Sequence, residues 1–166
     1  KSRERGDERG GQRGRKRTNE LLRSEGVVVP VHIMKFTSDK FTLLNAVTPA
    51  MYASSTKTTL PILESLMFRL KDNELLVYGY DLERGIRTSS TVYGMSDGVV
   101  MINAQKICGI IKNFPDGEIQ IESDEKNIVR IVGGMSDITV HGLSADTYPS
   151  LPELHGENRF TISAHM

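Results

Sequence analysis

Two stretches of the chain repeat one order of hydrophobic and polar positions. Alternating apolar residues predict half-buried strands, and apolar residues at three- and four-residue steps predict amphipathic helices. Residues 34–93 and residues 99–143 each give a short strand, a helix and three further strands. A recurring order of this kind indicates an internal duplication. The pattern predicts an α+β fold: a duplicated β-α-β-β-β unit with two helices packed on antiparallel sheets.

The first unit is expected to open with a strand at residues 34–37 and a helix capped by Ser38. Pro61 cannot continue a helix and favours an extended Leu60, so the chain must pass from helix to strand near this point. The apolar residues expected to face the core are Phe41, Leu44, Val47 and Met51. The expected strands are residues 66–71, 75–80 and 83–93, with a loop at 94–98.

The second unit repeats this plan. A strand at residues 99–102 leads to Asn103, the expected N-cap of a helix over residues 104–114. Pro115 and Gly117 end that helix. Its apolar stripe consists of Ile107, Ile110, Ile111 and Phe114. The expected strands are residues 118–122, 128–132 and 137–143.

Charge divides the chain although its net charge is zero. Residues 1–26 hold nine basic and five acidic residues, which leaves twelve basic and sixteen acidic residues for the remainder. With so little apolar surface, residues 1–33 are predicted to be a disordered basic extension. Two interpretations stay open: a nucleic-acid-binding arm, or sequence that is not native to the working protein, since Met34 resembles an initiator. We favour the second.

The end of the chain indicates that it comes from a longer protein. Residues 34–148 form the expected domain, and residues 149–158 contain proline and glycine with little periodicity, which predicts a linker. Residues 159–166 then resemble the truncated first strand of a second domain.

The residues that carry most enzyme chemistry are missing from the sequence. No phosphate-binding glycine loop, zinc-binding HExxH or nucleophile elbow occurs. Cys108 is the only cysteine, and no histidine has a neighbour at metal-ligand spacing. We therefore expect no catalytic residue, metal or cofactor, and a protein that is not an enzyme. A single cysteine allows no intramolecular disulfide, so the expected location is the reducing cytoplasm. No apolar run is long enough for a membrane span, so no membrane partner is expected.

Several short motifs occur in an order and spacing that resemble the N-terminal domain of the bacterial sliding clamp, the beta subunit of DNA polymerase III. They are Met34–Thr37, Leu43-Leu44, Thr59–Leu63, Tyr80–Glu83, Phe114-Pro115 and Tyr148–Leu151. The resemblance covers residues 34–166, and residues 1–33 match nothing in the family.

The resemblance implies the DNA clamp fold, in which helices line a hole and sheets form the outer wall. It also implies a DNA polymerase processivity factor: a fragment of a ring that encircles double-stranded DNA and tethers the replicative polymerase during chromosome replication. Lys57, Gln105 and Lys112 fall at DNA-binding positions. Gln105 replaces an arginine typical of the family, so at most a neutral hydrogen bond is expected there.

The family's rings close head to tail, which implies contacts with a second clamp protomer. The residues at those positions are Lys106, Ile110, Phe114, Ile138 and Val140. Ile138 and Val140 alternate with polar residues, so they fit a core position equally well. The clamp loader and replicative DNA polymerase are expected to bind domains missing here. The alternative function is a small nucleic-acid-binding module that acts through its basic N-terminal tail.

Overall fold

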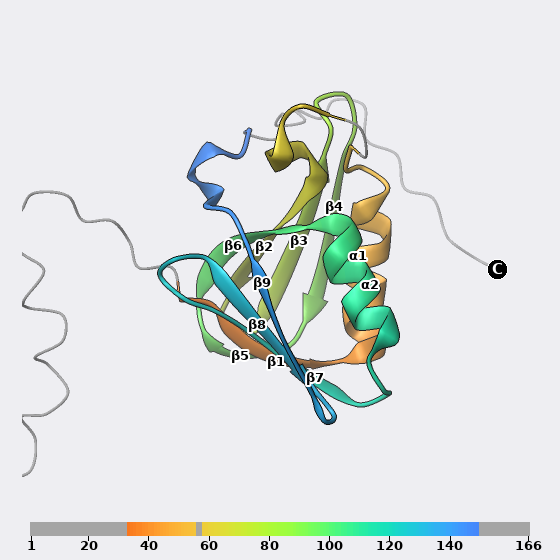
Figure 1. Cartoon of the computed structure of the whole chain (residues 1–166), viewed down its shortest axis with the longest axis vertical. Coiled ribbons are helices and arrows are strands. Elements are labelled where there is room, and N and C mark those ends of the chain that lie inside the picture. The colour runs from red at the N-terminus through yellow and green to blue at the C-terminus, as the bar shows by residue number, and fades with distance from the viewer. Residues whose placement is uncertain (1–32, 56–57, 150–166) are drawn as a thin grey trace, which may run out of the picture. The chain divides into compact units, whose positions relative to one another are not determined.

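The computed structural model describes residues 33–55 and 58–149, and the elements follow the order expected for a duplication (Figure 1). The predictions for residues 1–33, 149–158 and 159–166 lie almost entirely outside this part of the chain. The first half contains β1 (Lys35–Asp39), α1 (Lys40–Met51), η1 (Pro61–Glu64), β2 (Ser65–Lys71), β3 (Glu74–Tyr80), β4 (Gly85–Thr91) and β5 (Tyr93–Ser96). The second contains β6 (Gly98–Asn103), α2 (Ala104–Asn113), β7 (Glu118–Ser123), β8 (Ile128–Gly133), β9 (Ser136–His141) and η2 (Ala145–Thr147).

The two units exchange their first strands. The four-stranded sheet has the order β4-β3-β2-β6, and the five-stranded sheet has the order β5-β1-β7-β8-β9. The meander of the first unit is therefore completed by β6, and the meander of the second unit by β1. All these pairings are antiparallel. The predicted duplication is confirmed, and each sheet contains strands from both units.

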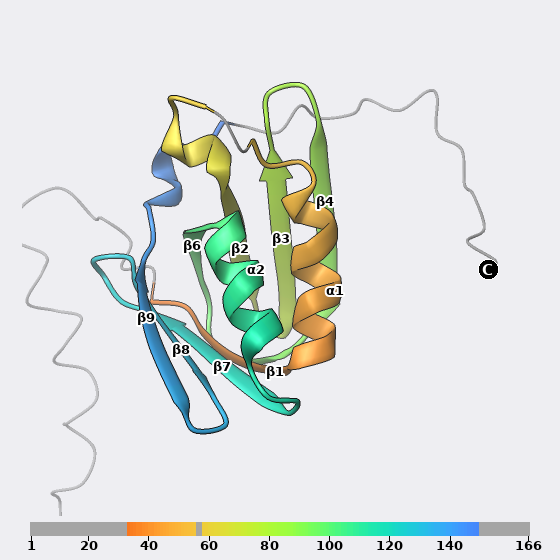
Figure 2. The same ribbon diagram turned by 45° about the vertical axis from the view of Figure 1, so that its right-hand side comes forward.

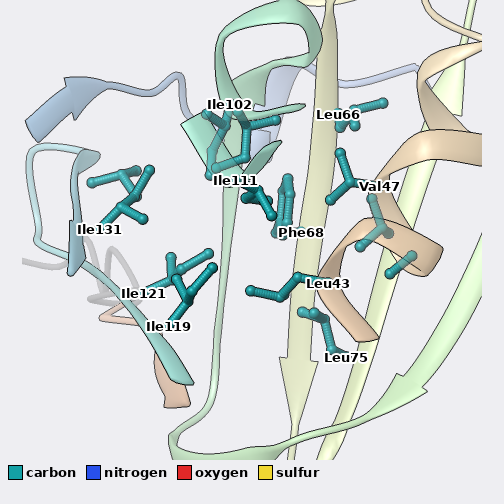
Figure 3. Close-up of a cluster of buried hydrophobic side chains, with 14 of the residues drawn as sticks. Leu43, Val47, Leu66, Phe68, Leu75, Ile102, Ile111, Ile119, Ile121 and Ile131 are labelled. Carbon is teal, nitrogen blue, oxygen red and sulfur yellow. The ribbon is translucent and has the colours of Figure 1, made fainter. Parts of the chain in front are cut away.

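The helices lie side by side and pack on the sheets (Figures 1 and 2). Between helices and sheets lies one hydrophobic core that draws on both units (Figure 3). Leu43 of α1 and Ile111 of α2 are fully buried in it, as is Phe68 of β2. Neither helix within the described ranges is long and apolar enough to cross a membrane.

The prediction for the buried face of α1 is correct for Val47 and wrong for Phe41, and Leu44 and Met51 are only partly buried. The N-cap is Asp39, not Ser38, and its carboxylate accepts a hydrogen bond from the backbone N–H of Thr42 at 2.9 Å. Phe41 is 73% exposed. Leu43, Ala46 and Ala50 are buried beside the predicted Val47. Two small alanines face the core because α1 lies close to β3: a side chain at Gly79 would collide with the carbonyl oxygen of Ala50.

The strand predicted over residues 83–93 is two strands, and residues 94–98 are not simply a loop. The chain leaves the four-stranded sheet after β4, and β5 joins β1 of the other sheet. Val92, which is 7% exposed, is buried at this change of sheet. Gly94 permits the close approach, since a side chain there would collide with the carbonyl oxygen of Asp72.

Candidate nucleic-acid surface and protomer interface

The sequence sets both ends of helix α2, and the buried residues of the helix decide which side faces solvent. The side chain of Asn103 accepts a hydrogen bond from the backbone N–H of Lys106 at 3.1 Å, which confirms the predicted N-cap. The helix ends before Phe114, whose extended backbone is the conformation that the following Pro115 favours. Ala104, Ile107, Cys108 and Ile111 are buried, so the opposite side of α2 faces solvent.

Two of the three predicted DNA-binding residues lie on this open side. Gln105 and Lys112 are both exposed. They are seven residues apart, close to two helical turns, so they share one side of α2. Lys57 lies outside the described residues.

The helix layer, which we define as α1 and α2, contains lysines and no carboxylate. The sequences of residues 40–51 and 104–113 hold Lys40, Lys106 and Lys112 and neither Asp nor Glu. Lys40 is already occupied: its ammonium group donates to the carbonyl oxygen of Phe114 at 2.7 Å and pairs with Asp116 at 3.1 Å. Among the described residues, no carboxylate pairs with Lys106 or Lys112. These two lysines are therefore available to an anionic partner.

The five predicted interface residues line one groove. The groove lies between α2 and β9, with a volume of about 470 Å³. The predicted residues in its lining are Lys106, Ile110, Phe114, Ile138 and Val140. Phe114 is only 4% exposed and belongs to the core, where it packs against Gly133. Ile110, Ile138 and Val140 are partly buried against that core. The structure thus brings the predicted residues together.

Strand β9 also offers an unpaired edge. It is the last strand of the five-stranded sheet and pairs with β8 alone among the described strands. Ile138 and Val140 point to the helix side and are half-buried, while Asp137 and Thr139 are exposed. An unpaired edge beside an apolar groove is a surface onto which another strand can pair.

A charge network on the other face of this sheet fixes β9, and the sequence analysis missed it. Arg130 pairs with Asp137 at 2.6 Å and with Glu122 at 3.3 Å, and Glu122 also pairs with Lys35 at 2.8 Å. The hydrogen bond from Arg130 holds the pKa of Asp137 below its ordinary value. Lys35 and then Arg130 likewise lower the pKa of Glu122. Lys35 faces Glu122 and Glu122 faces Arg130 in the strand register, whereas Asp137 lies two residues from Thr139, the residue that faces Arg130. Opposite charges on adjacent strands were the available signal.

The described residues contain no cluster of metal-ligating side chains, and their one cysteine is buried. Within residues 33–55 and 58–149, no three His, Cys, Asp or Glu side chains gather where they could hold a metal ion. Cys108 is 2% exposed and lies in the core. The groove between α2 and β9 is lined by amide, ammonium and apolar groups.

The two helices packed on two antiparallel sheets form the fold of a sliding-clamp domain, and comparisons with known proteins agree. Residues 34–152 match the family model described as DNA polymerase III beta subunit, N-terminal domain. The chain therefore belongs to this family, and the resemblance seen in the sequence is confirmed.

The relatives are longer proteins. The chain is 29% identical over 139 residues to the beta sliding clamp of Staphylococcus epidermidis, covering 79% of this chain and 37% of the relative. It matches the structure of the beta subunit from DNA polymerase of Streptococcus pyogenes with a TM-score of 0.71 and 26% identity, covering 76% of this chain and 34% of that one. The Bacillus subtilis DNA polymerase sliding clamp gives a TM-score of 0.70 and 28% identity, covering 74% and 34%. The chain spans about a third of the length of these relatives.

Proposed function

We propose that the chain is the first domain of a ring-shaped sliding clamp. The complete ring encircles duplex DNA in the bacterial cytoplasm and tethers the replicative polymerase without catalysing a reaction itself. The observation that carries this proposal is the helix layer, which has lysines and no carboxylate although residues 27–166 hold sixteen acids and twelve bases. Attraction to phosphate alone reads no sequence, so a duplex held this way is free to slide.

Within this proposal, Lys112 contacts a phosphate through its charge. Gln105 lies on the same side of α2 and donates a neutral hydrogen bond, which is weaker than a charged one. Lys57 is the third proposed DNA contact. All three act on the backbone of the duplex.

The groove between α2 and β9 is the proposed contact with a second clamp protomer. Ile110, Ile138 and Val140 offer apolar surface, Phe114 forms the floor, and Lys106 at the rim pairs with a carboxylate of the partner. A strand of the partner pairs with the free edge of β9. The clamp loader and polymerase act through parts of the full-length protein beyond residues 34–148, the proposed domain.

Duplex affinity tests the DNA-binding surface. Lys112→Ala in the 166-residue chain should weaken binding to a labelled duplex about equally for all sequences and lower the salt slope by about one. Lys126→Ala is the matched control, since Lys126 is also an exposed lysine but lies in the turn between β7 and β8. Fluorescence anisotropy across a salt series measures both. Equal losses in the two variants would contradict the proposal.

Deleting residues 1–33 separates the proposal from the tail-based alternative. A clamp domain should keep its duplex affinity and salt slope after the deletion, because its proposed contacts, Lys57, Gln105 and Lys112, all lie outside residues 1–33. If binding disappears with the tail, the alternative function is correct.

Sedimentation tests the protomer interface. We expect the 166-residue chain to be monomeric or to aggregate, because one edge of β9 is unpaired among the described strands. Ile138→Asp should suppress association, since it places a charge in the apolar groove. Thr139→Asp is its control on the opposite face of β9. A stable ring-like oligomer of this chain would overturn the assignment.

A further inference from the structure

The exposed face of α1 carries two aromatic rings. Phe41 is 73% exposed and Tyr52 is 68% exposed. Asn45 and Pro49 are the exposed residues between them. Positions 41, 45, 49 and 52 follow one line along a helix, because each step is close to a whole number of turns. This line contains no charged residue.

The spacing of the two rings suits a short linear ligand. Tyr52 keeps helical backbone angles as the C-cap of α1. Eleven residues therefore separate the rings by about 16 Å along the axis and by about 20° around it. At 3.4 Å per stacked nucleotide, this distance spans about five bases. Both rings project from one face at that separation.

The charges on α1 and α2 favour an anionic partner over a basic or neutral one. Neither α1 nor the adjacent α2 contains a carboxylate, and Lys112 of α2 has none paired with it among the described residues. The carboxylates at the start of α1 are engaged: Asp39 caps the helix and Asp116 pairs with Lys40. Exposed aromatic rings on one helix and cations on the helix packed against it provide the two features that proteins use to bind single-stranded nucleic acid.

We propose that the exposed face of α1 binds unpaired nucleobases, which stack on Phe41 and Tyr52 while Lys112 contacts the phosphate backbone. The inference rests on the proposed function, since it uses the same helix layer, but it names a different form of ligand. In a duplex the base faces are covered by their neighbours. Only a single strand can offer those faces to an aromatic side chain.

The sequence contains no tryptophan, so one introduced indole reports on its own surroundings. In the full chain carrying Phe41→Trp, the tryptophan fluorescence should be quenched to saturation by a 20-nucleotide oligothymidine. A 20-base-pair duplex should quench it much less. Tyr93→Trp is the matched control, because Tyr93 is 69% exposed but lies on β5. Equal quenching at both positions, or none at position 41, would overturn the proposal.

Three substitutions separate stacking from general apolar contact. Phe41→Ala should weaken oligothymidine binding by about 5- to 150-fold, the range expected for one stacked base. Phe41→Tyr should retain the affinity because it keeps an aromatic face, whereas Phe41→Leu should not. If leucine serves as well as tyrosine, the surface is an apolar docking site for a protein and the proposal is wrong. Circular dichroism checks that each variant is folded.

Duplex binding in the same variants shows which proposal fails. Phe41→Ala should leave duplex affinity unchanged, while Lys112→Ala should lower both duplex and single-strand affinity. Loss of the Lys112 effect on duplex, with oligothymidine stacking intact, would refute the sliding surface alone. An unchanged oligothymidine affinity in Phe41→Ala would refute the stacking surface alone.

Discussion

Two residues of α1, Phe41 and Leu43, offer a direct test of which helix face is buried. Leu43→Ala removes three buried carbon atoms from a side chain that is fully buried. At about 0.8 kcal/mol per methylene the transfer term is about 2.4 kcal/mol. The cavity left in the core raises the expected total to about 3–5 kcal/mol.

Phe41→Ala is the matched comparison and should change little. Its ring is 73% exposed, so we expect the free energy of unfolding to change by about 0.5 kcal/mol or less. Urea denaturation followed by far-UV circular dichroism gives both values, provided that the m-value stays constant. If Phe41→Ala costs as much as Leu43→Ala, then α1 is rotated relative to the core and the description of its buried face is wrong.

Three other predictions follow from the caps, the close contacts and the charge network. Asn103→Ala should lower the unfolding free energy by about 1 kcal/mol through loss of the α2 cap, measured by urea denaturation; no change would show that the cap is dispensable. Gly79→Ala should lower the unfolding free energy by about 1–3 kcal/mol, because the new carbon would force α1 away from β3. An unchanged midpoint of thermal unfolding would contradict this contact. The pKa values of Glu122 and Asp137 are lowered in the folded protein, so both carboxylates stabilise the fold. This contribution to the unfolding free energy is complete above the ordinary pKa values of 4.5 and 3.8 and is lost as the pH falls below them. Arg130→Gln should therefore make the unfolding free energy depend less on pH in the acid range. An unaltered pH dependence would show that the charge network is not the cause of the acid destabilisation.

Local patterns predicted the order of elements and most of their bounds. The α2 helix is the clearest case, because Asn103, the apolar positions and Pro115 all indicate the same segment. The buried face of α1 could be predicted only in part, through Val47. Apolar periodicity selects large side chains such as Phe41, whereas the close approach to Gly79 selects Ala46 and Ala50 for the core.

The candidate surfaces depended on information of a different kind. Lys112 and the groove residues came from the family resemblance, since their spacing fits an ordinary solvated helix and strand equally well. Hydrophobic alternation left the side of Ile138 and Val140 open, and only the packing of β9 beneath α2 decides it. The exchange of β1 and β6 was also beyond local pattern, because strand order is set by pairings between distant residues.

That exchange of strands constrains how the domain can form during synthesis. Phe36 of β1 pairs with Ile121 of β7, so the first strand made must wait until more than half of the described chain has left the ribosome. The β2–β3–β4 meander likewise waits for β6. Pairings between such distant residues slow folding and leave strand edges open in the meantime. We expect a nascent chain that ends before β7 to be recognised by chaperones, because β1 and β5 still lack the other three strands of their sheet.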